Sequence, residues 1–421
     1  MKRRRLGRGV AVVGAGMTRF GSFPGLSSRD LFVDAFQEML ASVDNGFHPQ
    51  DIEALFIGNF SSDLFEKQGH TAPIYTDWAG LLPRPAVRVE DACASGGVAL
   101  RQGIQAIASG MYDVVLVGGV EKMTNLPTGK VTDALSTAAD MAYEVAPAGF
   151  TFPGLYAAMA TAYMHQYSAT PETLMRVSIK NHENGALNPK AQFGARIRDT
   201  MTAKKASLVK KGLPEPAWQD ELDFLRDERA NPTIAWPLRL FDCSPVSDGA
   251  ALLLLVSEDL ARSITDKPLR VLGTGQASDG ALHNRASLHS IPAARLAAQE
   301  AYAMAGIGPA QVRVAEVHDC FTIAEIMASE DLGFFQPGDG GLAADEGLTA
   351  RNGLHPINTS GGLKSKGHPV GASGVGQVVE IWKQLRGEAG ERQAPGNPNI
   401  GLVHNVGGSG QTCAVTIFER I

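Results

Sequence analysis

The sequence predicts an α/β protein, in which short buried strands alternate with amphipathic helices. Short apolar runs bounded by Gly, Asn or Asp recur along the 421 residues, and such runs are typical of strands rather than helices. Helix-like stretches separate these runs, which is the pattern of an α/β architecture. Hydrophobic residues make up 44% of the chain, enough to bury a large core.

The first part of the chain alternates regularly between the two kinds of element. The predicted order is strand 10–16, helix 27–43, strand 54–60, helix 97–110 and strand 114–120. Residues 126–235 break this pattern, because they are rich in Met, Tyr, Asn and Gln with scattered charges, and they predict an inserted lobe. Its cationic stretch 195–212 fits both a solvated helical face and a phosphate-binding edge.

The second part of the chain repeats the order of the first. A glycine-rich turn, a helix and a strand ending in Gly-Gly occur both after residue 93 and near the C-terminus, which predicts an internal duplication. The elements expected in this part are strands at 251–257, 312–319, 400–407 and 413–419 and helices at 292–306 and 371–386.

Composition excludes several classes of function. The net charge of -6 gives no reason to expect nucleic-acid binding, and no apolar run reaches membrane-spanning length. The four cysteines form no CxxC pair, which argues against a metal site or a disulfide framework and favours a reducing compartment. The basic N-terminus reads as a solvated tail rather than a signal peptide. We therefore expect a cytoplasmic protein without a bound metal.

Cys93 stands in VEDACASGGVAL, immediately before a predicted helix. Backbone N–H groups and the dipole at a helix N-terminus favour an anion, so this position is expected to stabilise a thiolate. Small neighbours would let a carbonyl group approach closely. The same residue also fits a buried cysteine that acts as a small hydrophobe.

Three distant stretches supply partners for such a thiol. His368 lies in the glycine-rich turn of KSKGHPVGASG, where imidazole is available as a base. His318 and Cys320 follow a strand in VHDCFTIAEI, where α/β proteins place their sites. HNVGGSGQ, from residue 404, can expose N–H groups as an oxyanion hole. A capped helix, a loop histidine and a hairpin turn are the structural alternatives. A thiol, histidines and such a loop together suffice for acyl transfer through a thioester.

Four motifs, which follow one another along the chain in the family's order, resemble the thiolase superfamily over nearly the whole chain. One of them is VGGVEKMT, which is similar to the strand that follows the nucleophile helix. EDACASGG is similar to the nucleophile motif, GHPVGASG to the GHPxGxxG motif, and HNVGGSG to the C-terminal catalytic loop. The resemblance implies a five-layered αβαβα fold of two similar halves. It divides the chain into a first half of 1–125 completed by 236–262, an inserted loop domain of 126–235 and a second half of 263–421.

The resemblance also implies coenzyme A thioester chemistry and a role for each site residue. Cys93 would carry the acyl group and His368 would activate it. The backbone N–H of Cys93, with one near Val406 or Gly407, would form an oxyanion hole. Coenzyme A would be a substrate, without any tightly bound cofactor. The residues expected to bind the thioester substrate or coenzyme A are Ser244, Ser247, Gly367 and Gly408.

The chain departs from most thiolases at two motifs. HDCF replaces NEAF, and His404 replaces the second catalytic cysteine of the last loop. This combination is similar to the sterol-carrier-protein-type thiolases and their bacterial and archaeal relatives. In that branch the acid/base role falls on the HDCF cysteine, here Cys320, and His318 helps to form the first oxyanion hole.

The resemblance leaves partners and rival activities open. It implies a homodimer or a dimer of dimers, and some relatives of this branch work with a small subunit that carries a zinc ribbon and an OB-fold. Three rivals to a thiolase remain: a ketoacyl-synthase-like decarboxylating enzyme, a thiolase-like retro-aldolase acting on a steroid side-chain thioester, and a non-enzymatic acyl-CoA-binding scaffold. The acyl group and the direction of the reaction are not predicted.

Overall fold

A computed structural model describes residues 4–421; the first three residues of the basic tail lie outside the described residues. The strands predicted from apolar runs join two further strands, β3 and β8, in one hydrogen-bonded sheet with the order β3-β2-β4-β7-β1-β8-β11-β10-β9. β5 and β6 form a separate hairpin. The strands are β1 Val10–Met17, β2 Ala54–Gly58, β3 Ala86–Val89, β4 Val114–Glu121, β5 Thr233–Ala235, β6 Leu238–Arg239, β7 Gly249–Ser257, β8 Leu269–Ser278, β9 Val314–Glu316, β10 Ile400–Gly407 and β11 Thr412–Arg420.

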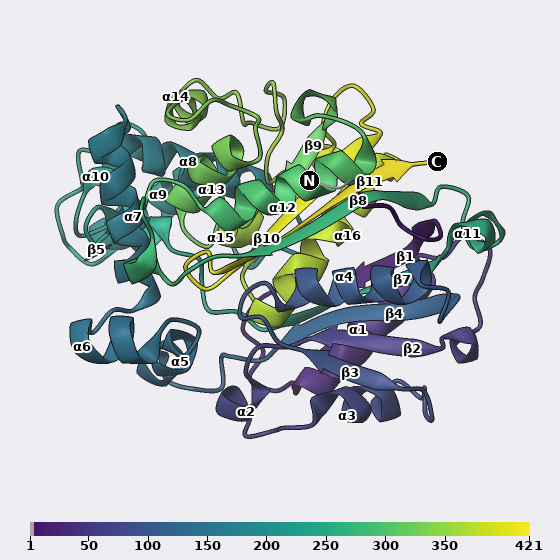
Figure 1. The fold of residues 1–421 in the computed structure, drawn as a ribbon. Helices are drawn as coiled ribbons and strands as arrows, with labels where there is room; N and C mark the ends of the chain where they lie inside the picture. Colours follow the sequence, from purple (N-terminus) through teal and green to yellow (C-terminus); the bar gives the residue numbers. More distant parts are fainter. Residues whose placement is uncertain (1–3) are drawn as a thin grey trace.

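Helices cover both faces of the sheet and make up most of the inserted segment (Figure 1). The helices are α1 Ser28–Ala41, α2 Ser62–Phe65, α3 Thr71–Trp78, α4 Ser95–Ala108, α5 Thr128–Ser136, α6 Ala146–Ala148, α7 Phe152–Gln166, α8 Pro171–Ala186, α9 Ile197–Lys210, α10 Glu221–Arg226, α11 Glu258–Ile264, α12 Pro292–Ala305, α13 Thr322–Asp331, α14 Asp339–Asp345, α15 Gly362–Lys366 and α16 Ser373–Arg386. None of these described helices combines the length and apolar character needed to cross a bilayer.

The nine strands make two half-sheets that touch at one corner. β1 and β8 pair over only two residue positions, Ala11 with Arg270 and Val12 with Leu269. On one side of this junction, β2 runs parallel to β4, and β7 runs antiparallel to both β4 and β1. On the other side, β10 runs parallel to β9, and β11 runs antiparallel to both β10 and β8. The two halves therefore share one topology, as the repeated sequence order predicts.

Helices α4 and α16 form the central layer between the half-sheets (Figure 1). Alternate residues of the buried strands face opposite cores, as the twofold period of a strand requires. In β1, Val10 and Val12 contribute to the core around the central helices, whereas Ala11 and Val13 face the outer helix α1. Helix α12 covers the outer face of the second half-sheet. The layers follow the order αβαβα.

Local sequence explains where the covering helices begin and end. Ser27 caps α1 in a capping box with Asp30, which satisfies two N–H groups at the start of the helix. α12 starts at Pro292 and ends at Ala305, and the next residue, Gly306, adopts the left-handed conformation of a C-terminal cap. The inserted segment, from α5 to β5, lies at the left of Figure 1, beside the ends of the central helices.

Candidate active site

Cys93 occupies a strained turn between β3 and the central helix α4. Ala92, just before it, has a φ of +48°, a conformation that a residue with a side chain adopts only when its surroundings enforce it. The Ser95 hydroxyl holds this turn, because it accepts from the Asp91 N–H at 2.9 Å and donates to the Ala92 carbonyl at 2.6 Å. The thiol therefore sits at the helix start, as the sequence predicts, and is only 9% exposed.

The structure brings Cys93, His318 and His368 into one cluster. One potential ligand atom from each of the three residues lies within 4.8 Å of the others. The two imidazole rings meet edge to face, with centroids 5.1 Å apart. Thiolate and imidazole are also donors that zinc prefers, so these three residues could hold a metal ion. One ring nitrogen of each histidine is also hydrogen-bonded to a protein group, His368 to Ser373 and His318 to Asn405.

A hydrogen bond from Nδ1 to Ser373 fixes the orientation of the His368 ring. Its Nδ1 lies 2.6 Å from the Ser373 hydroxyl, which in turn donates to the Pro369 carbonyl at 2.8 Å. Because the hydroxyl has only one hydrogen to give, Nδ1 carries the imidazole proton and Nε2 is left as an acceptor. The backbone N–H of His368 donates to the Ser247 hydroxyl at 2.9 Å. His368 is therefore held as a neutral base.

The titration of the cluster differs from what the sequence predicts. Burial raises the pKa of Cys93 to about 12, although backbone N–H groups of Gly408 and Cys93 itself oppose the rise. Burial also lowers the pKa of His368 to about 3. The expectation that the helix N-terminus stabilises a resting thiolate was wrong, because desolvation in this closed site outweighs the helix terminus. The resting pair is a neutral thiol beside a neutral imidazole.

Cys320 lies in the same cavity, held by a residue that the sequence reading missed. The Tyr156 side chain lies beside the Cys320 thiol, and its hydroxyl donates to the Gly408 carbonyl at 3.2 Å. Burial and the neighbouring Cys93 sulfur raise the pKa of Cys320 well above its usual value. The Tyr156 ring stacks on Phe321 with centroids 4.6 Å apart. In the sequence, the one sign that Tyr156 contributes to the site is its place in the aromatic stretch of the inserted segment.

A cavity of about 170 Å³ opens beside these groups. Cys93, Cys320, His368 and Gly408 supply its polar wall, and aromatic side chains from three separate segments supply the apolar one: Phe60, Phe152 and Phe321. A second cavity of about 460 Å³ adjoins it, since Cys243 and Ser244 line both.

The other predicted residues have different surroundings. Ser247 is fully buried and bonds to Gln192 and to the His368 backbone, so it supports the base rather than lining the cavity. Gly367 has a φ of +113°, where any side chain would be strained. Val406 and Gly407 still belong to β10, opposite Cys413 and Thr412. The N–H that contacts the Cys93 thiol belongs to Gly408; a share of Val406 or Gly407 in an oxyanion hole stays a prediction.

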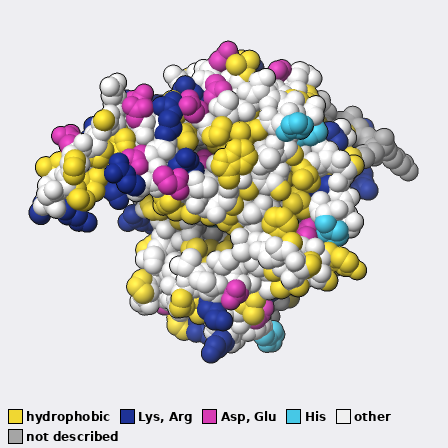
Figure 2. All heavy atoms as spheres, turned by 90° about the vertical axis from the view of Figure 1, so that its left-hand side faces the viewer, with side chains coloured by type: hydrophobic (Ala, Val, Ile, Leu, Met, Phe, Trp, Pro, Cys, Tyr) yellow, Lys and Arg dark blue, Asp and Glu magenta, His cyan; other side chains and the backbone are white. Residues whose placement is uncertain are grey.

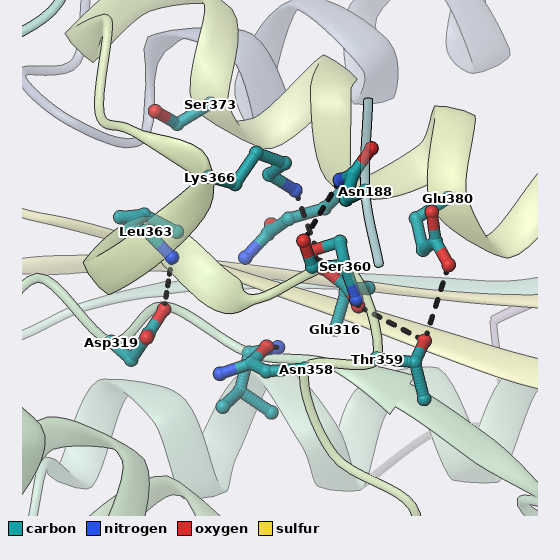
Figure 3. Close-up of polar contacts among 12 residues, drawn as sticks. Asn188, Glu316, Asp319, Asn358, Thr359, Ser360, Leu363, Lys366, Ser373 and Glu380 are labelled. Atoms are coloured by element: carbon teal, nitrogen blue, oxygen red, sulfur yellow. Dashed lines mark hydrogen bonds and ion pairs between the residues drawn. The ribbon is translucent and has the colours of Figure 1, made fainter. Parts of the chain in front are cut away.

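A buried polar network supports the loop that carries His368 (Figure 3). Glu316 accepts from the backbone N–H of Ser360 at 3.0 Å and lies 3.3 Å from the Lys366 ammonium. Asp319, the second residue of HDCF, accepts from the Leu363 N–H at 2.6 Å. The acidic residues therefore point to the loop, whereas His318 and Cys320 point to Cys93.

Comparisons with known proteins were made for the whole chain. The family model of the thiolase N-terminal domain matches residues 10–259, and that of the thiolase C-terminal domain matches residues 275–420. An acetyl-CoA acetyltransferase of Methanothermobacter thermautotrophicus is 45% identical over 98% of this chain and its own full length. Sterol carrier protein 2 of Bos taurus is 31% identical over 97% of this chain and 72% of its own length. The benzoylsuccinyl-CoA thiolase subunit BbsB of Thauera aromatica is 30% identical over 96% of both chains.

Solved structures show the same fold. The Ltp2–ChsH2(DUF35) aldolase superposes with a TM-score of 0.80 over 98% of both chains at 24% identity. Human mitochondrial 3-ketoacyl-CoA thiolase, solved with CoA, gives 0.71 over the full length of both chains at 18% identity. The protein is an acyltransferase of the thiolase type, for which coenzyme A is a substrate and no cofactor is tightly bound. The two family-model matches and the close relatives show that this chain belongs to the thiolase family.

Proposed function

We propose that the chain catalyses the thiolytic cleavage of a 3-oxoacyl-CoA by coenzyme A, or the reverse Claisen condensation, through a Cys93 acyl-enzyme. The observation that carries the proposal is the convergence of Cys93, Cys320 and His368 on one small cavity, with His318 in the same cluster as Cys93 and His368. A nucleophile, a base, an acid and a hydrogen-bond donor are the groups that this reaction needs.

The first half-reaction forms the acyl-enzyme. Cys93 Sγ attacks the 3-oxo carbon while its proton passes to His368 Nε2. The C2–C3 bond then breaks, and its electron pair forms the enolate of acetyl-CoA, whose C2 takes the proton of the Cys320 thiol. His318 donates a hydrogen bond to the enolate oxygen, and the N–H groups of Cys93 and Gly408 face the oxygen of the tetrahedral intermediate.

The second half-reaction returns every group to its starting state. The thiol of coenzyme A gives its proton to the Cys320 thiolate, and its sulfur attacks the acyl carbon on Cys93. The Cys93 sulfur leaves and recovers its proton from His368. No proton is gained or lost over the cycle, and the covalent intermediate divides one difficult step into two easier ones.

The acyl-enzyme is the step to test. Wild-type protein incubated with a panel of aliphatic, branched and aromatic 3-oxoacyl-CoA substrates should gain one acyl mass in intact mass spectrometry, and free coenzyme A should remove it. Cys93→Ala should lose both the adduct and thiolysis. Cys413→Ala, at a buried cysteine in β11 that does not line the cavity, should keep both. Cleavage that persists in Cys93→Ala would instead support retro-aldol chemistry.

We propose that coenzyme A reaches Cys93 through the larger cavity. Ser244 lies at the junction of the two cavities, and the buried Lys364 also lines the larger one. Thr200 of α9 stands at its edge, and the exposed Lys204 lies one turn further along the same face of that helix. Figure 2 shows basic side chains on the projecting part of this side of the molecule, above a hollow with apolar walls.

Lys204→Glu is the variant that tests this route. It should raise the KM for coenzyme A several-fold while kcat stays within about twofold, because a phosphate contact remote from the reacting atoms stabilises ground state and transition state alike. Lys67→Glu, at an exposed lysine beyond α2, is the matched charge reversal and should leave KM unchanged. Equal KM values in the two variants would place the coenzyme A phosphates elsewhere.

We also propose that the active form is a homodimer formed through the open edge of the first half-sheet. β3 pairs with β2 on one side only, and Trp78, Leu82 and Val87 expose large apolar side chains beside it. The opposite edge, at β9, is closed by bridging of Ala315 to Ile357. An open apolar edge strand is a template for pairing with a second chain.

A small partner subunit and the domain division complete the proposal. The names of the Ltp2–ChsH2(DUF35) aldolase and of the thiolase subunit BbsB support a partner subunit for this chain. That the partner carries an OB-fold and a zinc ribbon is an expectation from the resemblance alone. Size-exclusion chromatography with and without products of neighbouring genes tests it, and full activity of the homo-oligomer alone would contradict it.

We propose the halves 1–125 with 236–262 and 263–421, and the insertion 126–235.

A further inference from the structure

Asn405, in β10, ties the nucleophile to one of the two histidines of the cluster. Its Oδ1 accepts from the backbone N–H of Gly97 at 3.0 Å, and its Nδ2 donates to the carbonyl of Cys93 at 2.9 Å. A backbone N–H can only donate and a carbonyl can only accept, so these two partners establish which atom of the Asn405 amide is the oxygen and which is the nitrogen. The NH₂ group of Asn405 therefore faces the active site.

The same NH₂ group determines the tautomer of His318. Asn405 Nδ2 lies 3.2 Å from His318 Nδ1. An amide nitrogen cannot accept, so Nδ1 must be the unprotonated nitrogen and the ring proton must lie on Nε2. Burial, with His368 and His404 close by, also lowers the pKa of His318 well below its usual value, so the ring is neutral.

The Nε2–H that results is a free donor next to the nucleophile. His318 is only 1% exposed, and its Nε2 has no hydrogen-bond partner among residues 4–421. The ring packs edge to face on His368, within the cluster that includes Cys93. A buried N–H without a partner is unfavourable, and an oxygen atom of a bound substrate would satisfy it.

Glycines on both central helices make room for Asn405. A Cβ on Gly97 of α4 would lie 2.9 Å from Asn405 Oδ1, and one on Gly374 of α16 would lie 2.2 Å from it. The amide is therefore enclosed by α4 and α16 and has no room for another orientation. Close packing and hydrogen bonding thus fix the same arrangement independently.

We propose that Asn405 is a positioning residue that holds His318 as the neutral Nε2–H tautomer, so that the imidazole presents a preformed donor to the substrate oxygen on which negative charge develops. The effect on catalysis rests on the proposed thiolase function. The tautomer itself does not, because it is a property of the protein without substrate.

The tautomer can be measured directly by NMR on full-length protein labelled with ¹⁵N in its ten histidines. His318→Gln identifies the His318 signals by their loss. In the wild type we expect the pattern of a protonated Nε2 and an unprotonated Nδ1. Asn405→Leu, which keeps the size of the side chain and removes its donors, should lose this fixed pattern. Gln377→Met is the matched control, because Gln377 is a buried amide on α16 whose one side-chain hydrogen bond within residues 4–421 goes to the carbonyl of His404 in β10.

Kinetics give the second measurement. Loss of one oriented donor costs roughly 10²–10³ in kcat in other oxyanion holes, so Asn405→Leu should show a kcat lower by about that factor with KM within about threefold. Gln377→Met should keep the His318 tautomer and most of kcat. An Nδ1–H tautomer in wild-type protein, or an unchanged tautomer in Asn405→Leu, would overturn the proposal whether or not the variant is stable. A wild type with the expected tautomer but without thiolase activity would overturn the proposed function alone.

Discussion

At the scale of single residues, the central fact is that the Cys93 thiol and the His368 imidazole are both neutral at rest. The pKa values of about 12 for Cys93 and about 3 for His368 differ by about nine units. Burial disfavours both the thiolate and the imidazolium, so the neutral pair is the stable form before substrate binds. In the proposed mechanism, proton transfer therefore accompanies formation of the carbon–sulfur bond, when the oxyanion hole begins to stabilise charge.

This predicts the pH dependence of alkylation at Cys93. Only the thiolate reacts with iodoacetamide, and its fraction below the raised pKa grows about tenfold for each pH unit. The rate should rise from pH 6 to pH 9 without a plateau. His368 has a lowered pKa, so it stays neutral in this range and adds no step near pH 6.5. Peptide mass spectrometry at Cys93 measures the rate, and a plateau below pH 8 would show that the thiol is activated at rest.

The sequence could indicate the reacting residues but not the ones that orient them. Cys93, His318, Cys320 and His368 each stand in a motif with a recognisable order along the chain, and the structure brings them together. Asn405 contacts His318, more than 80 positions away in the sequence, and Cys93, more than 300 positions away. Such contacts exist only once the layers have packed, so a reading of local patterns cannot find them.

At the scale of elements, a strand could be predicted where it is buried on both faces. β1, β4, β7 and β10 are buried along their whole length and β11 along most of it, and each matches a predicted run closely. β8 was not predicted, because Gly273 and Gly275 interrupt its apolar pattern. A Cβ on Gly275 would lie 2.0 Å from the Ala297 carbonyl, so these glycines let α12 lie directly on the strand. The glycines that allow this close packing also interrupt the apolar pattern from which a strand is predicted.

The same crowding predicts the effect of a single methyl group between the central helices. An alanine in the middle of a helix is normally more stable than a glycine by about 0.5–1 kcal/mol. At position 374 the new Cβ would lie 2.2 Å from Asn405 Oδ1 and 2.5 Å from the Gly97 nitrogen. Gly374→Ala should therefore lower the free energy of unfolding by about 1–3 kcal/mol, as overpacked core substitutions do.

Urea denaturation followed by circular dichroism measures this change. Gly129→Ala, in the first turn of α5, is the control, since a Cβ there meets no atom within 4 Å. It should be neutral or slightly stabilising. A Gly374→Ala variant as stable as this control would mean that α4 and α16 can separate at no cost, and that the enclosure of Asn405 is loose.

At the scale of the whole molecule, the active site lies where the two repeated halves meet. Cys93 comes from the start of α4 in the first half, whereas His318, Cys320, His368 and Gly408 come from the second. The starts of the paired helices α4 and α16 approach each other there, since Gly96 faces the chain just before α16. Repetition of one α/β unit thus brings together a group of side chains that neither half could form alone.

The open edge of β3 gives the last prediction, which concerns assembly. Val87 is 52% exposed on this strand, and a lysine on an edge strand opposes pairing with another chain. Val87→Lys should shift the protein from a two-chain to a one-chain mass in size-exclusion chromatography with light scattering, without a change in its circular dichroism. Val209→Lys is the matched control, because Val209 of α9 is also 52% exposed and lies in the inserted segment. If both variants keep the wild-type mass, the dimer uses another surface, and a one-chain mass for the wild type would exclude the dimer.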